Sequence, residues 1–378
     1  MSERWVLQFC HSHYGPFMDV ARQYAVLFAG TPFKVLTVFL TGDDTPAVRA
    51  GAASDEVLFL GQGSRDVRGL KLGAIRALRN IMASRKVELI IAHRFKPIYI
   101  ACLASKLPVI GVHHGFGDYK RWPRRWFARL FRRRLSLLGV SDAVRDDIRT
   151  CLPDWPDARI ETLYNRIDLA AVQGTHLDRP AARAALQLPA DAFIVGNVGR
   201  LHPDKDQATL IRGFALALPT LPANALLALM GTGPLEHALK MLAAREGVAD
   251  RVVFLGNVND GRRYFKAFDV FALSSDHEPF GMVLLEAMAA QIPVICSDCG
   301  GGKEVVKDAG LLFPMAHPQA LATAITELAG QTEAQRQKTT LAALQKVRTL
   351  FSDIAAREKF FSLQPVIDSL RFQPEGQH

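Results

Sequence analysis

The chain has 378 residues, of which 49% are hydrophobic and 22% are charged. This length exceeds one ordinary hydrophobic core, so we expect two domains in a globular protein. No apolar run approaches the ~18 residues that cross a membrane, which argues against an integral membrane protein.

The net charge of +9 lies entirely in the first half of the chain. Residues 1–178 hold 26 Lys and Arg against 17 Asp and Glu, whereas residues 179–378 hold 20 of each kind. This asymmetry predicts that the first half faces an anionic partner. Five cysteines, an odd and sparse number, are typical of a reducing compartment. The first residues lack the pattern of a signal peptide, so we expect a cytoplasmic protein.

Short apolar runs alternate with helical patterns along the chain. Runs of this kind without strict polar alternation suit strands buried on both faces, and the helices between them indicate parallel βαβ units. The sequence therefore predicts an α/β fold with two doubly wound, Rossmann-like parallel-sheet domains that face each other across a cleft. The runs are 5–9, 33–40, 57–60, 89–92, 109–112, 135–140 and 160–164, then 194–198, 225–230, 252–255, 270–273, 293–296 and 310–313.

We expect residues 1–170 to form the first domain and residues 171–350 the second. Residues 168–188 are rich in Ala, Arg and Pro and show no strand pattern, which predicts a linker. Residues 351–378 have a helical pattern, and we expect this segment to cross back to the first domain.

Histidines follow two predicted strands of the first half. His93 comes directly after the run 89–92, and His113 and His114 end the next strand. An imidazole at a strand end can donate a hydrogen bond to a hydroxyl or a phosphate, and it titrates near neutrality. The alternative is that each of these histidines is structural.

Residues 119–135 hold eight cations and no acid. On a helical projection Trp122, Trp126, Phe127, Leu130 and Phe131 share one side, and most of the arginines share the other. This pattern predicts a basic amphipathic helix that binds an anionic membrane surface or a phosphorylated glycolipid. Alternatively, the aromatic residues pack on the domain's own sheet and the arginines are solvated. No nucleic-acid module accompanies the patch, so we expect no nucleic-acid partner. The residues predicted to contact the acceptor or the membrane are His113, His114, Arg124, Arg125, Trp126, Arg129, Arg132 and Arg133.

Each predicted strand of the second half is followed by glycine, a cation or a carboxylate. Ligands of parallel sheets bind beyond the carboxyl ends of the strands, so these loops are candidate site elements. In the loop after residues 270–273, Gly281 opens a helix whose first N–H groups suit a phosphate, while Glu278 and Glu286 suit hydroxyl groups. The alternative is a surface helix with an acidic first turn. The motifs are Gly199-Arg200-Leu201 with Lys205, Gly231-Thr-Gly233-Pro234, Asn257-Val258, Glu278-Pro-Phe280-Gly281-Met282 with Glu286, and Gly301-Gly302-Lys303-Glu304.

These motifs, in this order over residues 193–313, resemble the donor-binding domain of the family 4 glycosyltransferases, a large retaining family with the GT-B fold. In the first half, the segment from Asn165 to Asp168 is similar to the family's Asn-Gly-Val-Asp, with Arg166 in place of glycine. The loop after the first strand departs from the family's double-glycine pattern because it carries Gly15 alone.

The resemblance implies a role for each motif. Arg200 and Lys205 would neutralise the diphosphate leaving group, on which negative charge grows in the transition state. Glu286 would bind the ribose hydroxyls and Glu278 the sugar, with His93 near the reacting carbon. The implied catalytic residues are Arg200, Lys205, Glu278 and His93. The implied donor-binding residues are Gly15, Gly199, Arg200, Lys205, Gly231, Gly233, Asn257, Val258, Glu278, Phe280, Gly281, Met282 and Glu286.

We expect no metal and no other cofactor, because cations already serve the diphosphate. Asp204 and Asp206 do match the Asp-x-Asp pattern of metal-dependent transferases, which leaves a bound metal as the alternative.

The resemblance thus implies a retaining hexosyltransferase that moves a sugar from a nucleotide sugar, a UDP-sugar above all, to a lipid-linked or lipopolysaccharide-core saccharide. We expect it to act at the inner face of the membrane as a peripheral protein. The alternatives are another GT-B enzyme, such as a sugar-nucleotide epimerase or a transferase with a soluble acceptor, and a binding protein without turnover.

Overall fold

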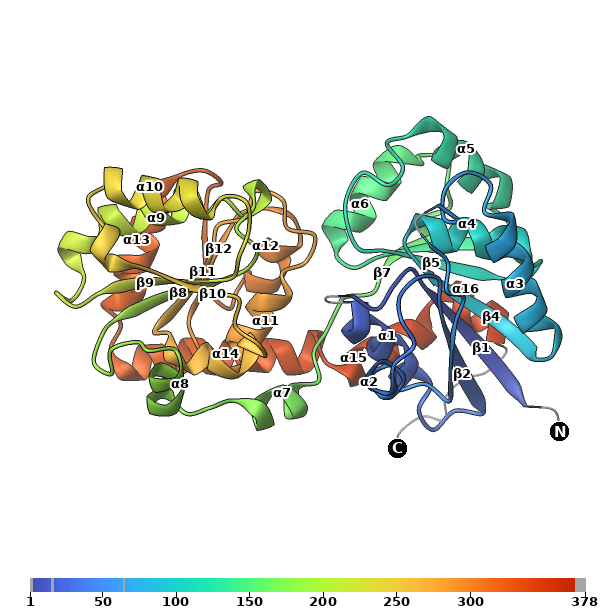
Figure 1. Cartoon of the computed structure of the whole chain (residues 1–378), viewed down its shortest axis with the longest axis horizontal. Helices are drawn as coiled ribbons and strands as arrows, with labels where there is room; N and C mark the ends of the chain where they lie inside the picture. Colours follow the sequence, from blue (N-terminus) through green and yellow to red (C-terminus); the bar gives the residue numbers. More distant parts are fainter. Residues whose placement is uncertain (1–2, 15–16, 64, 371–378) are drawn as a thin grey trace. The chain divides into compact units, whose positions relative to one another are not determined.

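The computed structural model describes residues 3–14, 17–63 and 65–370. The chain divides into two compact units, unit 1 with Met1–Asn165 and Asp353–His378, and unit 2 with Arg166–Ser352 (Figure 1). Each unit is an open parallel sheet with helices on both faces, which confirms the predicted doubly wound α/β architecture.

The unit 1 sheet has the strand order β3-β2-β1-β4-β5-β6-β7, and all its pairs are parallel. Strand β1 pairs with β2 from Arg4↔Phe33 to Cys10↔Phe39. The order reverses between β1 and β4, the position at which such sheets open for a ligand. The strands are β1 (Arg4–Cys10), β2 (Phe33–Phe39), β3 (Glu56–Phe59), β4 (Lys86–His93), β5 (Val109–His113), β6 (Leu135–Gly139) and β7 (Ile160–Thr162).

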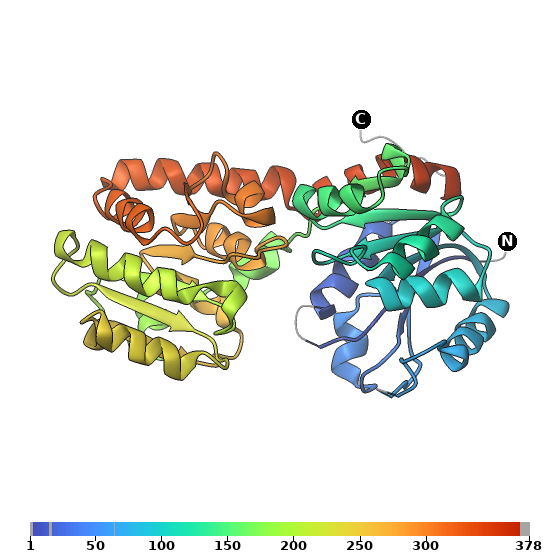
Figure 2. The ribbon, with the colours of Figure 1, turned by 90° about the horizontal axis from the view of Figure 1, so that it is seen from above.

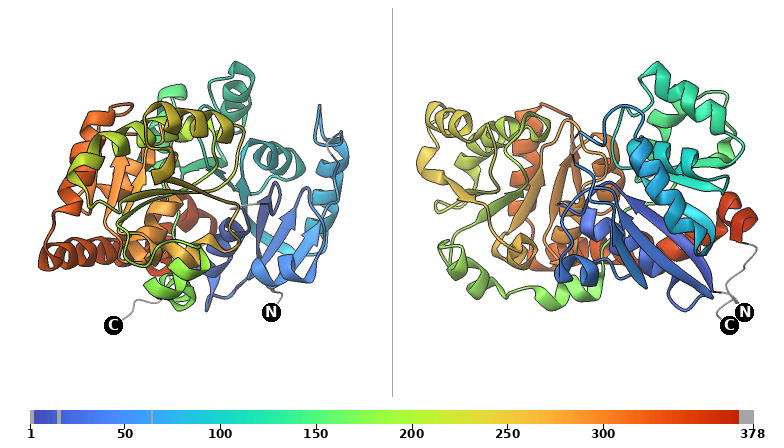
Figure 3. Two further views of the ribbon diagram at one scale, coloured as in Figure 1. Left: turned by 60° about the vertical axis from the view of Figure 1, so that its left-hand side comes forward. Right: turned by 45° about the vertical axis from the view of Figure 1, so that its right-hand side comes forward.

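The helices of unit 1 come from both ends of the chain. After unit 2 the chain returns to unit 1, where α16 lies against β4 and Phe28 packs edge-on against Phe360 and Phe361 of α15 (Figures 2 and 3). The helices are α1 (Phe17–Ala25), α2 (Pro46–Gly51), α3 (Leu72–Ala83), α4 (Phe95–Ala104), α5 (Trp122–Phe131), α6 (Asp142–Cys151), α15 (Asp353–Ser362) and α16 (Gln364–Leu370), with the 3₁₀ turns η1 (Val26–Phe28) and η2 (Asp157–Arg159).

The unit 2 sheet has the order β10-β9-β8-β11-β12-β13, again with parallel pairs throughout. Its order reverses between β8 and β11. The strands are β8 (Ile194–Val198), β9 (Leu226–Met230), β10 (Val252–Gly256), β11 (Val270–Leu273), β12 (Val294–Ser297) and β13 (Leu311–Phe313). Every apolar run that the sequence predicted as a strand is one, with small shifts at the ends.

Helices cover both faces of this second sheet. Helices α9, α10 and α13 lie side by side on one face, and α11 packs against α7 and α14 on the other (Figure 1). The helices are α7 (Leu169–Thr175), α8 (Arg179–Ala185), α9 (Gln207–Ala217), α10 (Glu236–Arg245), α11 (Met282–Ala289), α12 (Gly300–Val306), α13 (Pro318–Ala329) and α14 (Glu333–Leu350), with η3 (Pro203–Lys205), η4 (Leu218–Thr220), η5 (Ala249–Arg251) and η6 (Gly261–Ala267).

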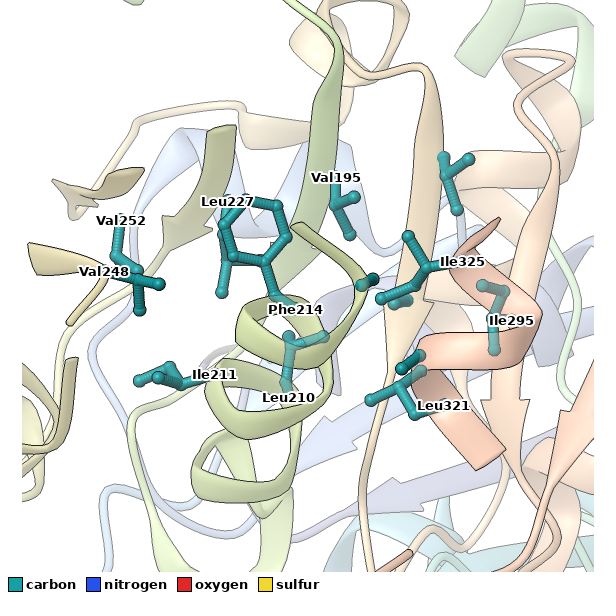
Figure 4. Packing of buried hydrophobic residues seen from close by; sticks show 14 of the residues in the cluster. Val195, Leu210, Ile211, Phe214, Leu227, Val248, Val252, Ile295, Leu321 and Ile325 are labelled. Carbon is teal, nitrogen blue, oxygen red and sulfur yellow. The ribbon is translucent and has the colours of Figure 1, made fainter. Parts of the chain in front are cut away.

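The main core of unit 2 lies between its sheet and the helix pair α9 and α13. Phe214 of α9 and Ile325 of α13 are fully buried against Leu227 of β9 and Val195 of β8 (Figure 4). Burying one such side chain contributes about 1.5–3 kcal/mol, so this layer holds the sheet that carries the loops described below.

The predicted linker segment, residues 168–188, has no strand; it carries helices α7 and α8 and lies at the start of unit 2. Asp168 and Asp178 each cap a helix by accepting the N–H three residues on, at 3.0 and 2.9 Å. Arg183 of α8 is buried and donates to Asp269 at 2.8 Å. Two good caps and a buried ion pair outweigh the loop-like composition.

The predicted basic helix over residues 119–135 is shorter than expected and spans Trp122–Phe131. Pro123 stands in its first turn, a position that favours helix initiation. Arg134 lies beyond the helix and donates to the carbonyl of Leu107 at 3.1 Å. Among the residues described, none of the helices combines the length and the apolar character needed to cross a bilayer.

Candidate functional site

The loops after β8 and β11 meet at the point where the unit 2 strand order reverses. Gly199 and Arg200 follow β8, and the segment Ser274 to Gly281 follows β11. The two loops are joined directly, because the Ser274 hydroxyl donates to the Lys205 carbonyl at 3.0 Å and Asp276 N–H donates to the Asp204 carbonyl at 3.2 Å. The structure therefore brings together the predicted Arg200, Lys205 and Glu278 at one edge of the sheet.

Lys205 and Glu278 form an ion pair at this edge. The Lys205 ammonium donates to Glu278 Oε2 at 2.7 Å, and the Ser275 hydroxyl donates to the same oxygen at 3.2 Å. Glu278 is only 7% exposed, so its charge depends on these two donors. Ser275, which the sequence analysis missed, is buried and precedes Glu278 by three residues in the same loop.

Arg200 differs from Lys205 in its exposure. Its side chain is 69% exposed and lies 3.4 Å from Asp204, which also bonds to His202. Its backbone is held, because Gln207 donates to the Arg200 carbonyl at 2.9 Å. A fixed backbone with an exposed guanidinium can present a planar, always charged fork to an oxyanion.

The glycines of the Gly-x-Gly motif serve backbone packing. A Cβ on Gly231 would lie 1.9 Å from the Gly199 carbonyl oxygen, and one on Gly233 would lie 2.2 Å from that of Leu201. Gly231 also has φ +141°, a conformation that side chains rarely adopt. At Gly199, by contrast, a Cβ would meet nothing within 4 Å, so this position leaves room for a ligand.

The loop from Glu278 leads into α11. Gly281, with φ +94°, is the N-cap, and no side chain of the described residues caps this helix. The N–H groups of its first turn, starting at Met282, carry the partial positive charge of a helix N-terminus. Phe280 is a core residue, 3% exposed and packed edge-on against Phe351, so its backbone alone can face a ligand.

A further glycine pair supports this loop. Gly301 N–H donates to the Glu278 carbonyl at 2.9 Å, and a Cβ on Gly301 would lie 2.3 Å from the Pro279 carbonyl oxygen. Gly302 lies beside the Glu278 side chain. The start of α12 thus holds the Glu278 loop from behind, a role that the run Gly300-Gly301-Gly302 signals in the sequence.

Glu286 lies on α11 and is largely buried. Its carboxylate is 3.9 Å from Arg262 of η6, a neighbour that the sequence analysis did not identify. Asn257 and Val258 follow β10, where the carbonyl of Gly256 accepts the Gly231 N–H at 2.8 Å. The predicted donor-binding residues Asn257 and Val258 thus stand on the loop after β10, and Glu286 on helix α11.

The Asp-x-Asp pair is engaged in local structure. Asp206, in the left-handed region at φ +42°, caps α9 by accepting the Thr209 N–H at 3.2 Å. Asp204 bonds to His202 and lies near Arg200. In the described ranges no group of three His, Cys, Asp or Glu side chains is arranged to hold a metal ion.

In unit 1 the predicted histidines occupy the carboxyl edge of the sheet. His93 is 1% exposed, with Gln8 at 3.2 Å on one ring nitrogen and His114 at 3.2 Å on the other. Burial, with a smaller effect of the neighbouring His114, lowers the pKa of His93 well below its usual range. His93 is therefore a buried, neutral imidazole. The predicted donor contact Gly15 lies outside the described residues.

His113 is fully buried and holds a structural network. Its Nδ1 lies 2.8 Å from Asp118, and its Nε2 lies 3.2 Å from the Tyr119 hydroxyl. Asp118 also bonds to Arg124 of α5. His113 and Arg124, both predicted to contact the acceptor or the membrane, thus connect α5 to strand β5.

Helix α5 carries an exposed stripe of apolar side chains. Trp122, Trp126 and Leu130, at i, i+4 and i+8, are 70%, 62% and 61% exposed. Phe127, on the other side of the helix, is buried against Phe95 and Tyr99 of α4. The predicted single aromatic side is thus divided between the core and the surface.

The arginines of residues 119–135 differ in their exposure to solvent. Arg129, Arg132 and Arg133 are exposed, whereas Arg125 is half-buried. Arg129 forms an exposed ion pair with Asp154 at 3.0 Å.

Replacing Gly231 and Gly199 separately by alanine distinguishes packing from ligand approach. We expect Gly231→Ala to lower the free energy of unfolding by about 3 kcal/mol, because its Cβ would overlap the Gly199 carbonyl in a strained conformation. The free energy of unfolding of Gly199→Ala should stay within about 0.5 kcal/mol of the wild-type value. Urea denaturation measures the free energy of unfolding of both variants. Equal losses of stability would contradict the assignment of Gly231 to packing and of Gly199 to ligand approach.

Comparison with known proteins places the chain in a family. The family model described as Glycosyltransferase Family 4 matches residues 33–171, and the model described as Glycosyl transferases group 1 matches residues 178–343. The lipopolysaccharide core biosynthesis glycosyltransferase LpsD of Rhizobium meliloti is 32% identical over 224 residues, which are 57% of this chain and 64% of that protein. The D-inositol 3-phosphate glycosyltransferase of Mycolicibacterium gilvum is 37% identical over 175 residues, 45% of this chain and 39% of its own. The matches therefore span less than two thirds of these relatives' length.

Solved structures share the fold over nearly the whole chain. A glycosyltransferase from Rickettsia africae has a TM-score of 0.83 at 15% identity and covers 99% of this chain and 100% of its own. Anabaena Alr3699/HepE, solved in complex with UDP, has a TM-score of 0.75 at 21% identity. The match covers 95% of this chain and 98% of that protein. Since the two family models together match most of the sequence, the chain belongs to the family 4 glycosyltransferases with the GT-B fold.

Proposed function

We propose that the protein is a retaining glycosyltransferase that moves a sugar from a nucleotide sugar to a saccharide acceptor. One observation carries the proposal: an exposed Arg200, the Lys205–Glu278 ion pair and the uncapped N-terminus of α11 belong to loops at the reversal point of one sheet. Positive charge and free backbone donors beside a buried carboxylate suit a sugar diphosphate, which presents phosphates and hydroxyls together.

The leaving group sets the main catalytic demand. As the glycosidic bond breaks, negative charge grows on the diphosphate, and Arg200 supplies a fixed cation where that charge develops. Lys205 is held by Glu278, whose same oxygen also accepts from Ser275, so little reorganisation is needed when the phosphates arrive. Glu278 would contact the sugar, and the backbone N–H groups at Phe280, Gly281 and Met282 would bind a phosphate.

We propose that the transfer retains the configuration of the sugar. No carboxylate of unit 1 stands out in the sequence as a general base, so we infer that the departing phosphate oxygen takes the acceptor's proton on the same face of the sugar. We expect no metal in this mechanism. Asp206 caps α9, and Arg200 and Lys205 supply the positive charge that a metal would otherwise provide.

For the substrates we propose a UDP-sugar and a lipid-linked or lipopolysaccharide-core acceptor. The relative LpsD is named for lipopolysaccharide core biosynthesis, and LpsE of the same organism, 37% identical over 148 residues, carries the same description. UDP is the first nucleotide to test, because a protein of this fold was solved with it. Release of UDP from a UDP-sugar, measured over a panel of donors, tests the proposal, whereas binding without release would favour a non-catalytic sensor.

We further propose that α5 docks the enzyme as a peripheral protein on the inner, cytoplasmic face of an anionic membrane. Its Trp122, Trp126 and Leu130 side chains are exposed, as interfacial anchors are, and Arg129, Arg132 and Arg133 stand beside them. Packing within unit 1, against α4, explains Phe127 but leaves these three apolar side chains in solvent.

Arg200→Ala should lower kcat by on the order of 10²–10³, because the lost cation acts where charge grows in the transition state. Folding should be unchanged, since the side chain is exposed.

Lys205→Ala should lower kcat too, and should also destabilise the fold by on the order of 3 kcal/mol by leaving Glu278 without its counterion. Arg212→Ala on α9, an exposed arginine 3.5 Å from Glu246, is the matched control. Wild-type turnover in Arg200→Ala would refute this role.

Glu286→Ala should weaken the binding of UDP by about 1–3 kcal/mol if the carboxylate accepts the ribose hydroxyls. Calorimetry with UDP alone measures the change. Glu236→Ala, which removes an exposed acid paired with Lys240 on α10, should bind UDP like the wild type. Unchanged affinity in Glu286→Ala would show that this carboxylate serves Arg262 rather than the nucleotide.

Reversing Arg129, Arg132 and Arg133 to glutamate should abolish sedimentation with anionic vesicles. Each surface cation contributes about 1 kcal/mol near such a membrane, so three reversals remove more than 3 kcal/mol. High salt should weaken the binding of the wild-type protein to these vesicles in the same way. Donor hydrolysis should persist, because the nucleotide site belongs to unit 2. A triple mutant that still sediments at low salt would contradict membrane docking by these arginines.

A further inference from the structure

A pocket of about 210 Å³ lies at the amino edge of the unit 1 sheet. Val109 begins β5 and Ser136 is the second residue of β6, and both line this amino-edge pocket. Helix α16 and the turn η2, which contact each other, supply further parts of its wall. His93 and His113 end their strands and therefore stand at the opposite edge of the sheet. The amino-edge pocket is thus separate from the predicted histidines.

Three arginines from two parts of the chain line the amino-edge pocket. Arg133 and Arg134 follow α5, and Arg159 is the last residue of η2. In the part of the chain that the structure describes, no carboxylate forms an ion pair with any of these three guanidinium groups. Like charges that are grouped without a counterion raise the local potential, so the pocket attracts an anion.

Neutral groups hold two of these arginines in place. Arg134 donates to the carbonyl of Leu107 at 3.1 Å and to the carbonyl of Cys102. Arg159 Nη1 donates to the Ser136 hydroxyl at 3.4 Å. These partners orient the guanidinium groups without neutralising their charge. Positive charge is therefore in position before a ligand arrives, which lowers the cost of ordering side chains on binding.

Arg133 and Ser136 retain donors for a ligand. Arg133 is exposed, and its guanidinium has no partner among residues 3–14, 17–63 and 65–370. Ser136 is only 4% exposed, and its hydroxyl accepts from Arg159 while its own proton has no acceptor in the same ranges. Both side chains can therefore donate to an oxygen atom in the pocket.

One acidic side chain also lines the pocket. Asp368 of α16 is exposed and accepts a hydrogen bond from Gln364 Nε2 at 2.7 Å, one turn earlier on the same helix. Three arginines against this one aspartate leave the pocket with a net positive charge. The carboxylate should reduce the affinity for an anion without reversing the preference.

The size of the amino-edge pocket limits its ligand. Its volume of about 210 Å³ exceeds the roughly 150 Å³ of a cavity that holds benzene. It is smaller than the roughly 300–1,000 Å³ of pockets that enclose drug-sized ligands. An anion with few atoms beyond its charged group therefore fits best.

A phosphate monoester matches these donors better than a carboxylate does. It carries about −1.5 to −2 charges at neutral pH and has three terminal oxygens that accept hydrogen bonds. Guanidinium groups bind such oxygens through paired N–H donors. A carboxylate has one charge and two oxygens, so it would leave donors of the three arginines unused.

We propose that the amino-edge pocket binds a phosphate monoester, which belongs to a soluble ester or to a lipid headgroup. Arg133, Arg134 and Arg159 are its charged donors, and Ser136 is a neutral one. None of these residues belongs to the unit 2 site, so this binding does not depend on sugar transfer. Arg159 also lies outside residues 119–135, so its effect can be distinguished from membrane docking by α5.

Calorimetry of the full chain with glycerol 3-phosphate measures this site. Arg159→Ala should weaken binding by about tenfold to a hundredfold, the usual effect of losing a hydrogen bond to a charged group. Arg159→Lys keeps the charge without the planar fork and should give a smaller loss. Arg76→Ala removes an exposed arginine of α3 outside the pocket and should bind like the wild type.

Two further variants keep the test independent of folding. Arg133 is exposed and without a partner in the described ranges, so Arg133→Ala should fold normally and still bind glycerol 3-phosphate about tenfold more weakly. Asp368→Asn removes the one negative charge of the lining and should bind severalfold more tightly.

Vesicles distinguish the two sources of the phosphate. Phosphatidic acid presents a phosphate monoester, whereas phosphatidylserine presents a diester in a headgroup that is also anionic. Sedimentation with phosphatidic acid vesicles that is lost in Arg159→Ala, with sedimentation on phosphatidylserine vesicles retained, would assign the site to a lipid headgroup. Binding of glycerol 3-phosphate without any effect of Arg159→Ala on either vesicle would assign it to a soluble ester.

Three results would overturn the proposal. The first is a wild-type protein that does not bind glycerol 3-phosphate at millimolar concentration, and the second is wild-type affinity in both Arg133→Ala and Arg159→Ala. The third is a loss of binding in Arg200→Ala alone, which would place the phosphate in unit 2. All three are measured without a sugar donor, so a failure of the proposed glycosyl transfer leaves this test intact.

Discussion

Parallel pairing of strands that are buried on both faces is the constraint on which the rest of this protein depends. In a parallel sheet every strand ends at the same edge, so the strand-to-helix loops of each unit collect there. The strand order reverses beside β1 in unit 1 and beside β8 in unit 2, where neighbouring loops diverge. The polar side chains that the sequence predicts for function, Arg200 and Glu278 in one unit and His93 in the other, all stand at these two places.

Packing of backbone against backbone brings the unit 2 loops together. At Gly231 and Gly233 the chain approaches the loop after β8 so closely that no side chain fits, and Gly301 supports the Glu278 loop in the same way. A buried carboxylate in such a place needs compensation, and Glu278 obtains it from Lys205 and Ser275. The result is a site whose charges are arranged before any ligand binds, which is what electrostatic stabilisation of a leaving group requires.

Unit 1 uses burial for a different purpose. His93 is removed from water, and burial lowers its pKa well below the usual range, so it contributes hydrogen bonds rather than charge. Much of the positive charge of this half lies on exposed side chains, among them Arg129 of α5 and Arg132 and Arg133 directly after it. Helix α5 packs on α4 through Phe127 and is linked to β5 through Arg124 and Asp118, and its outer face keeps two tryptophans exposed.

The sequence by itself determined the strands, the two doubly wound sheets and the loops that carry the unit 2 site. Strand periodicity and glycine spacing are local properties, and the carboxyl-edge rule converts them into positions. Tertiary structure decided what local patterns leave open. Whether Trp126 and Phe127 face solvent or the core depends on α4, and whether residues 168–188 form helices depends on capping and on the buried partner Asp269. The burial of His93 between Gln8 and His114 likewise depends on the fold, because its hydrogen-bond partners are neighbours in space that lie far apart in the chain.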